Sequence, residues 1–137
     1  MSNTAAGVFF FSKNTRRFLY LLRNEWKNFT WSIPGGRIES TETLLAGVSR
    51  ECEEEIQFSP KLLKLVPIQK FVNNSFVYHT FFCAVEEEFI PILNDEHCGY
   101  AWVDEYQHPN PLHPGLSSTV NIDSVQDKLD ALTKRET

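Results

Sequence analysis

Four glutamates lie within five consecutive positions of this chain, at 51 and 53–55, in a stretch that we expect to be helical. Like charges three or four positions apart repel one another and weaken an isolated helix. A sequence that keeps them gains something elsewhere, and binding of a hard divalent cation is the simplest gain that carboxylate oxygens offer. Carboxylates that bridge cations to a diphosphate would support attack of water on the anhydride.

Helical geometry sorts these acids. At about 100° per residue, one arc of roughly 140° contains three acids and one base. Its members are Arg50, Glu51, Glu54 and Glu55. Glu53 points to the far side, into water. The adjoining arc is apolar, so we expect it to pack on a core. That arc consists of Leu45, Val48, Cys52 and Ile56.

Glycines surround the acidic arc. Gly47 lies inside it, where a missing side chain would let a loop or a phosphate approach closely. The turn Pro34-Gly35-Gly36 precedes the helix, and its glycines permit a backbone conformation that side chains bar.

The segment from Gly36 to Phe58 resembles the signature of the Nudix hydrolase superfamily. That signature is a glycine, five residues, Glu, seven residues, Arg-Glu, an aliphatic residue, any residue, Glu-Glu, any residue, Gly and an aliphatic residue. The positions in register are Gly36, Glu42, Arg50, Glu51, Glu54 and Glu55. Gln57 replaces the second glycine, and Cys52 and Phe58 replace the aliphatic residues. Because glycine there usually supplies a left-handed cap, the Gln57 change concerns the helix end and not a metal ligand.

The resemblance implies a Mg²⁺ site, in which Mn²⁺ could substitute. Glu54 and Glu55 would be metal ligands, and Glu51 would either bind metal or take the proton from water. The carbonyl of Gly35 stands where the superfamily uses a backbone ligand. Arg50 would orient a carboxylate and so support catalysis without touching substrate.

A second segment, LNDEHCGYAWVDEY at 93–106, resembles the stretch before the last strand in Nudix enzymes that cleave dinucleoside polyphosphates. There Glu96 would complete the metal site or act as the base, so the choice of base between Glu51 and Glu96 stays open. A simple surface acid is the alternative reading of Glu96. We expect His97 to orient groups or contact substrate, because oxygen ligands suit Mg²⁺ better.

Residues that would recognise the rest of a substrate are less sharply marked. Arg23 and Arg37 lie near the glycine turn and could contact phosphate, or else be solvated surface residues. Tyr78 could stack on a base, although a β-rich core also needs aromatic side chains. The same two readings apply to Phe71, Trp26 and Trp31.

Composition bounds the class of protein. With 137 residues and 42% hydrophobic residues, the chain predicts a single domain over 1–137 with a substantial core. No apolar run reaches the ~20 residues of a membrane span. The net charge of −5 argues against broad nucleic-acid binding, but not against a small nucleotide substrate. Three widely spaced cysteines form no zinc or disulfide pattern, which favours a reduced, cytoplasmic protein. A homodimer is possible.

The elements that must position these residues follow from the hydrophobic pattern. We expect strands over 6–12 and 17–23 as a hairpin, and over 29–33, 62–72, 75–85 and 100–103. The acidic helix should begin at an N-cap of Ser40 or Thr41, with Glu42 in its first turn. A late helix follows from Ile122, Val125, Leu129 and Leu132, and 112–116 resembles the loop before it. The pattern predicts an α+β or mixed fold, and the resemblance implies an α/β/α sandwich with both helices packed on a mixed sheet.

The resulting expectation is a Mg²⁺-dependent pyrophosphohydrolase. Its substrate would be a nucleoside diphosphate linked to another moiety, as in a dinucleoside polyphosphate, an ADP-ribose-like compound or a nucleoside triphosphate. An RNA 5′-end pyrophosphohydrolase is related, but the acidic charge speaks against it. A catalytically silent nucleotide sensor is the alternative from another class, and the intact Glu51, Glu54 and Glu55 argue against it. The register of the motif argues against a chance match in an unrelated domain.

Overall fold

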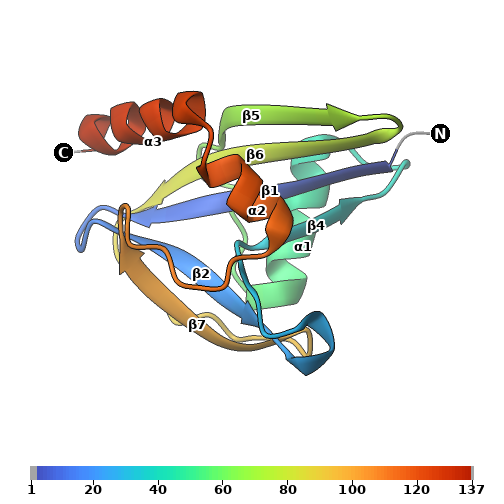
Figure 1. The fold of residues 1–137 in the computed structure, drawn as a ribbon, viewed down its shortest axis with the longest axis horizontal. Helices are drawn as coiled ribbons and strands as arrows, with labels where there is room; N and C mark the ends of the chain where they lie inside the picture. The colour runs from blue at the N-terminus through green and yellow to red at the C-terminus, as the bar shows by residue number, and fades with distance from the viewer. Residues whose placement is uncertain (1–2, 137) are drawn as a thin grey trace.

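The computed structural model describes residues 3–136, which form a mixed seven-stranded β-sheet with helices on both faces (Figure 1). The strands are β1 (Asn3–Ser12), β2 (Arg17–Arg23), β3 (Trp31–Ser32), β4 (Gly35–Ile38), β5 (Val66–Asn73), β6 (Phe76–Val85) and β7 (His97–Asp104). The helices are the 3-10 turn η1 (Glu25–Lys27), α1 (Leu44–Ile56), α2 (Pro114–Val120) and α3 (Asp123–Arg135). The sheet order is β3-β2-β1-β6-β5, with β4 paired to β1 and β7 paired to β2.

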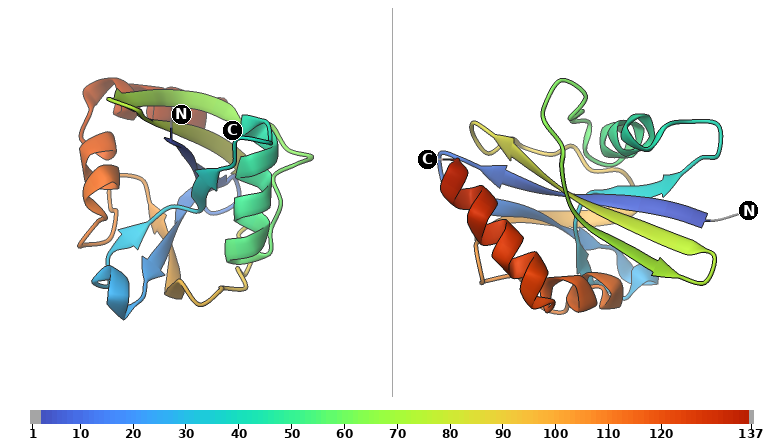
Figure 2. Two further views of the ribbon diagram at one scale, coloured as in Figure 1. Left: turned by 90° about the vertical axis from the view of Figure 1, so that its right-hand side faces the viewer. Right: turned by 90° about the horizontal axis from the view of Figure 1, so that it is seen from above.

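Strand β1 is the centre of the fold, because its apolar run is buried on both faces. Ala6, Val8 and Phe10 face the core under α1. Phe9 and Phe11 face a second core under α2 and α3. Strand β1 is antiparallel to β2 and β4 and parallel to β6, so the sheet is mixed. Figure 2 shows α1 on one side of the sheet and α2 and α3 on the other. The α+β prediction is confirmed.

Several predicted elements are present at nearly their predicted bounds. The hairpin of β1 and β2 and the pair of β5 and β6 are both antiparallel. In α3, Val125, Leu129 and Leu132 are buried as predicted. Strand β7 is longer than predicted, because it pairs with β2 over almost the whole length of that strand. No helix within residues 3–136 has the length and apolar character needed to cross a membrane.

The glycine turn is partly a strand, which the sequence did not predict. Gly35–Ile38 forms β4 and pairs with the start of β1. Gly35 has φ +151, and a Cβ atom there would lie 2.0 Å from the carbonyl oxygen of Ala6. Glycine is therefore required for two backbones to meet this closely. The pairing depends on β1, some thirty positions away, so local sequence gave no sign of it.

The start of α1 differs from the prediction. Thr43 is the N-cap, since its hydroxyl accepts from the amide of Ala46 at 3.2 Å, and the prediction of Ser40 or Thr41 was wrong. Glu42 therefore precedes the helix instead of lying in its first turn. Leu45 is 54% exposed, and Leu44 packs on the core instead. The buried stripe thus begins one residue earlier and continues through Val48.

Three connecting segments also differ. The predicted strand at 29–33 shrinks to β3, because Phe29 has a positive φ. The predicted strand at 62–72 begins only at Val66, after a turn in which Leu63 donates to the carbonyl of Pro60. The predicted loop at 112–116 contains the start of α2, capped by His113 and with Pro114 at its first position.

Candidate active site on the acidic face of α1

Glu55 is the most deeply placed of the predicted ligands. It is only 7% exposed, and its Oε1 accepts a hydrogen bond from the Gly35 amide at 2.9 Å. Burial raises the pKa of Glu55 to about 8, and the Glu96 and Glu51 carboxylates add to that effect. The Gly35 hydrogen bond opposes it. A cation bound beside Glu55 would offset this cost of burying the ionised carboxylate.

Glu51 lies over the second glycine of the same turn. A Cβ atom on Gly36 would lie 2.3 Å from Oε2 of Glu51, so a side chain at position 36 would displace this carboxylate. Burial raises the pKa of Glu51, and the Arg50 guanidinium opposes that shift. The turn at positions 35–36 therefore receives both Glu55 and Glu51, one turn of helix apart.

Arg50 joins the helix to the chain before it. Its guanidinium contacts Glu42 at 2.7 Å, Glu51 at 3.1 Å and Glu54 at 2.6 Å, and donates to the carbonyl of Arg37 at 3.0 Å. These contacts fit the predicted role of Arg50 in orienting carboxylates. Glu54 is nevertheless 54% exposed, so the two adjacent acids 54 and 55 occupy very different surroundings.

Gly47 makes room for Glu42. A Cβ atom there would lie 2.8 Å from Oε1 of Glu42 and equally close to Ile38. The space predicted at Gly47 is thus filled by the preceding loop. The Arg50 hydrogen bond lowers the pKa of Glu42, which keeps that side chain ionised beside the guanidinium.

Glu96, in the loop directly before β7, reaches the same face. The amide of Asn94 donates to the carbonyl of Glu55 at 3.2 Å, which fixes this loop against the end of α1. The Asn94 side chain donates to Glu96 at 3.3 Å. The Glu96 charge raises the pKa of both Glu51 and Glu55, so Glu96 lies near enough to act on these two acids.

The donor set suits a hard divalent cation, which prefers carboxylate and carbonyl oxygens. Within residues 3–136, no three acidic, histidine or cysteine side chains converge closely enough to hold a metal as they stand. In this arrangement Arg50 holds Glu51 and Glu54 in ion pairs. A cation beside Glu55 would favour the ionised form that burial opposes.

A corner formed by Arg23, His97 and His113 adjoins the acids, since the Arg23 charge opposes the raised pKa of Glu55. Arg23 on β2 is paired with His97 on β7. Burial lowers the pKa of His97 to about 4, so its ring is neutral at pH 7. Its Nδ1 lies 3.3 Å from Oδ1 of Asn94, which already accepts from the Glu96 amide. Asn94 therefore fixes the proton of His97 on Nδ1 and leaves Nε2 as an acceptor.

His113 is a member of this corner that sequence reasoning missed. Its amide donates to the carbonyl of Trp31 at 2.8 Å, which sets it beside β3. Burial lowers its pKa, with the charges of Arg23 and Lys27 adding to the effect. The position before Pro114, at the start of a helix, was the one sequence signal available.

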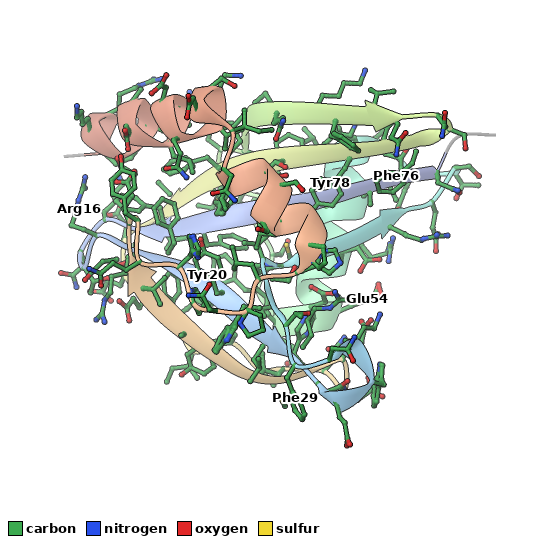
Figure 3. All side chains as sticks on the ribbon, in the orientation of Figure 1. Arg16, Tyr20, Phe29, Glu54, Phe76 and Tyr78 are labelled. Carbon is green, nitrogen blue, oxygen red and sulfur yellow. The ribbon has the colours of Figure 1, made fainter. Side chains whose placement is uncertain are left out.

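The other two predicted substrate contacts are placed differently from each other. Tyr78 lies on the sheet face opposite α1, near Phe76 (Figure 3). A Cβ atom on Gly7 would lie 2.3 Å from the Tyr78 hydroxyl, so Gly7 admits that ring. Burial raises the pKa of Tyr78 to about 12, and the Glu55 charge adds to it. Arg37 is exposed and joins the site only through its carbonyl.

Comparison with known proteins gives a consistent result. The NUDIX domain family model matches residues 1–120. The dihydroneopterin triphosphate diphosphatase of Haemophilus influenzae is 32% identical, and the match covers 74% of this chain and 74% of that protein.

Solved structures share the fold at lower identity. MutT from Aliivibrio salmonicida and Vibrio cholerae is similar with a TM-score of 0.76 and 20% identity, covering 93% of this chain and 99% of that one. A C. elegans Ap4A hydrolase is similar with a TM-score of 0.72 and 17% identity, and the match covers 93% of this chain and 96% of that one. The E. coli dihydroneopterin triphosphate pyrophosphohydrolase is similar with a TM-score of 0.66 and 20% identity, and the match covers 96% of this chain and 95% of that one.

Proposed function

This chain belongs to the NUDIX domain family and is a Nudix hydrolase, and we propose that it is a Mg²⁺-dependent pyrophosphohydrolase that cleaves the diphosphate linkage of a nucleoside diphosphate linked to another moiety. The observation that carries the proposal is Glu55, buried against the Gly35 amide with its pKa raised to about 8. Two further acids, Glu51 and Glu96, act on it through their charge.

The metal would be held by the Gly35 carbonyl and by Glu51, Glu54, Glu55 and Glu96, with Mn²⁺ as a possible substitute. When bound, it would neutralise diphosphate charge and make water easier to deprotonate. Glu51 and Glu96 are the two candidates to accept the proton of the attacking water. Arg50 holds Glu51 at 3.1 Å, whereas the Asn94 side-chain amide donates to Glu96 at 3.3 Å.

The phosphate chain would extend toward Arg23, whose guanidinium is well suited to phosphate oxygens. His97 and Tyr78 would contact the remainder of the substrate. Because the Haemophilus influenzae relative is named for a triphosphate substrate, triphosphates come first among the compounds to test. Dinucleoside polyphosphates and ADP-ribose-like compounds follow.

The test is phosphatase-coupled phosphate release across a panel of compounds, each with Mg²⁺, Mn²⁺ or a chelator. The panel holds dihydroneopterin triphosphate, nucleoside triphosphates, diadenosine polyphosphates, ADP-ribose and 5′-triphosphate RNA. We expect metal-dependent cleavage of one class of small compound. Binding of nucleotides without turnover of any compound would refute the enzyme reading and support a sensor. Cleavage of the RNA alone would move the substrate to an RNA 5′ end.

A further inference from the structure

A wide hollow of about 1170 Å³ opens beside the end of β1, and the proposed activity does not use it. Its walls come from the β1–β2 turn, the segment after β6, the loop after α1 and the end of α3. Its lining includes Phe58, Leu63, Glu86, Glu87 and Phe89. None of the carboxylates at 42, 51, 54, 55 and 96 lines it.

The floor of the hollow is apolar and rigid. The rings of Phe58 and Phe89 stack at 4.0 Å with an interplanar angle of 2°. Phe10 of the central strand packs edge-on against both, at 5.5 and 5.7 Å. A pair of aromatic rings fixed from below presents a ready contact surface for an apolar side chain.

The rim of the hollow carries charges of both signs, with acids in excess. Its charged lining residues are Lys13, Arg16, Glu86, Glu87, Glu88 and Glu136. Glu88 is paired with Arg17 at 3.0 Å, and Glu86 is paired with Lys13 at 3.0 Å while its side chain stays 83% exposed. Glu87 is exposed and forms no ion pair among the residues that the structure describes. The rim therefore retains negative charge that a basic partner could meet.

The loop at 57–65 has the complementary character. It projects from the body of the molecule in both views of Figure 2. Its sequence at 61–64 is Lys-Leu-Leu-Lys, and all four residues are exposed. Leu62 is 95% exposed, while the next residue, Leu63, lines the hollow of its own chain. Leu62 therefore points away from that hollow and cannot fill it.

We propose that a second copy of this chain docks here, with the 61–64 loop of each copy entering the hollow of the other. Leu62 would cover the Phe58–Phe89 pair, and Lys61 and Lys64 would meet Glu86 and Glu87. One chain carries both the basic, apolar 61–64 loop and the acid-rimmed, apolar hollow. This self-complementarity is what a two-fold interface requires. A single exposed leucine is ordinary, but one flanked by bases beside an acid-rimmed aromatic floor is matched to that surface.

Charge reversal tests the proposal with the full chain. Sedimentation should show the wild-type protein as a concentration-dependent dimer. The pair Lys61→Glu with Lys64→Glu should be monomeric, as should the pair Glu86→Lys with Glu87→Lys. An equimolar mixture of these two variants should dimerise again, because each loop then meets a hollow of opposite charge. Lys70→Glu, on the exposed part of β5, is the matched control and should stay dimeric.

A wild-type protein that is monomeric at every concentration would overturn the proposal. So would a dimer that persists in both reversed variants, or a mixture that fails to re-associate although thermal melts show both variants folded. None of these readouts involves turnover, so they stand or fall apart from the proposed activity.

Discussion

Two regions of this protein hold an acid whose pKa is raised first of all by burial, and they are built differently. Glu55 on α1 accepts a hydrogen bond from the Gly35 amide, and the Glu96 and Glu51 carboxylates raise its pKa further while the Arg23 charge opposes them. Glu105, just after β7, is raised by burial and by the nearby Asp130 of α3. Its own contacts are with α3, including Thr133 at 3.4 Å.

The second region is closed by the protein itself. Tyr106 donates to Asp130, and Arg16 donates to the carbonyls of Thr133 and Glu136, so both the segment after β7 and the β1–β2 turn are bonded to α3 and the residue after it. One oxygen of Glu105 is buried without a partner, which a proton shared with Asp130 would satisfy. Beside Glu55, by contrast, the chain turns through Gly35 and Gly36, and the missing side chain at Gly36 leaves room for the Glu51 carboxylate. A raised pKa therefore does not by itself mark a ligand site, because the protein already bonds the second region to itself.

The largest difference in turnover between changes in the two regions should follow removal of the Glu55 charge. We expect Glu55→Gln to lower turnover by roughly 10²–10³-fold or more, the range seen when one group that stabilises transition-state charge is lost. Glu105→Gln should leave turnover unchanged, and so should Glu53→Gln, which removes the same charge from the exposed side of α1. Steady-state rates at saturating Mg²⁺ measure this. Near-normal activity of Glu55→Gln would show that the Glu55 region contributes no more to turnover than the Glu105 region.

The corner of Arg23, His97 and His113 should show a smaller effect. Arg23→Ala should raise KM about tenfold or more, because a charge-assisted hydrogen bond contributes ~1.5–3 kcal/mol. Arg37→Ala is the matched control, since its side chain is exposed and only its carbonyl joins the site. Equal effects of both changes would place the phosphate chain elsewhere.

Stability should depend on pH through Glu55. The pKa of this group is raised in the folded protein, so the unfolded chain loses the proton first and stability falls as pH rises from about 4.5 to about 8. Glu55→Gln should flatten this dependence and stabilise the metal-free protein at pH 8 by roughly 1–3 kcal/mol. Urea unfolding of both proteins at pH 5 and pH 8 measures it. A variant less stable than wild type at pH 8 would contradict the burial cost assigned here.

The smallest effect is expected at the helix end next to Glu55. Gln57 caps α1 with φ 52 and ψ 37, a left-handed conformation that costs a side chain more than glycine. Gln57→Gly should therefore be tolerated, with a gain of up to ~0.5 kcal/mol after the added freedom of the unfolded chain is subtracted. Because it leaves every charge in place, it isolates the backbone contribution beside Glu55. A loss above ~1 kcal/mol would reveal a side-chain role for Gln57.

The sequence predicted the acidic face of α1, the hairpin, the late helix and the α+β class, since each follows from a local pattern. It did not predict β4, which pairs with β1 across two glycines. It placed Glu54 and Glu55 together, whereas a rotation of about 100° between neighbours exposes one and buries the other. It missed His113, because the corner containing it forms only when β3 meets the start of α2.

The most direct test of the account is titration of the Glu55 and Glu105 carboxyl groups by carbon NMR, with and without Mg²⁺. Without metal, the pKa of Glu55 should be near 8. With saturating Mg²⁺ it should fall well below that value, while the pKa of Glu105 stays where it was. A Glu55 titration that Mg²⁺ leaves unchanged, or that shifts no more than Glu105, would contradict the assignment of this face as a metal-dependent active site.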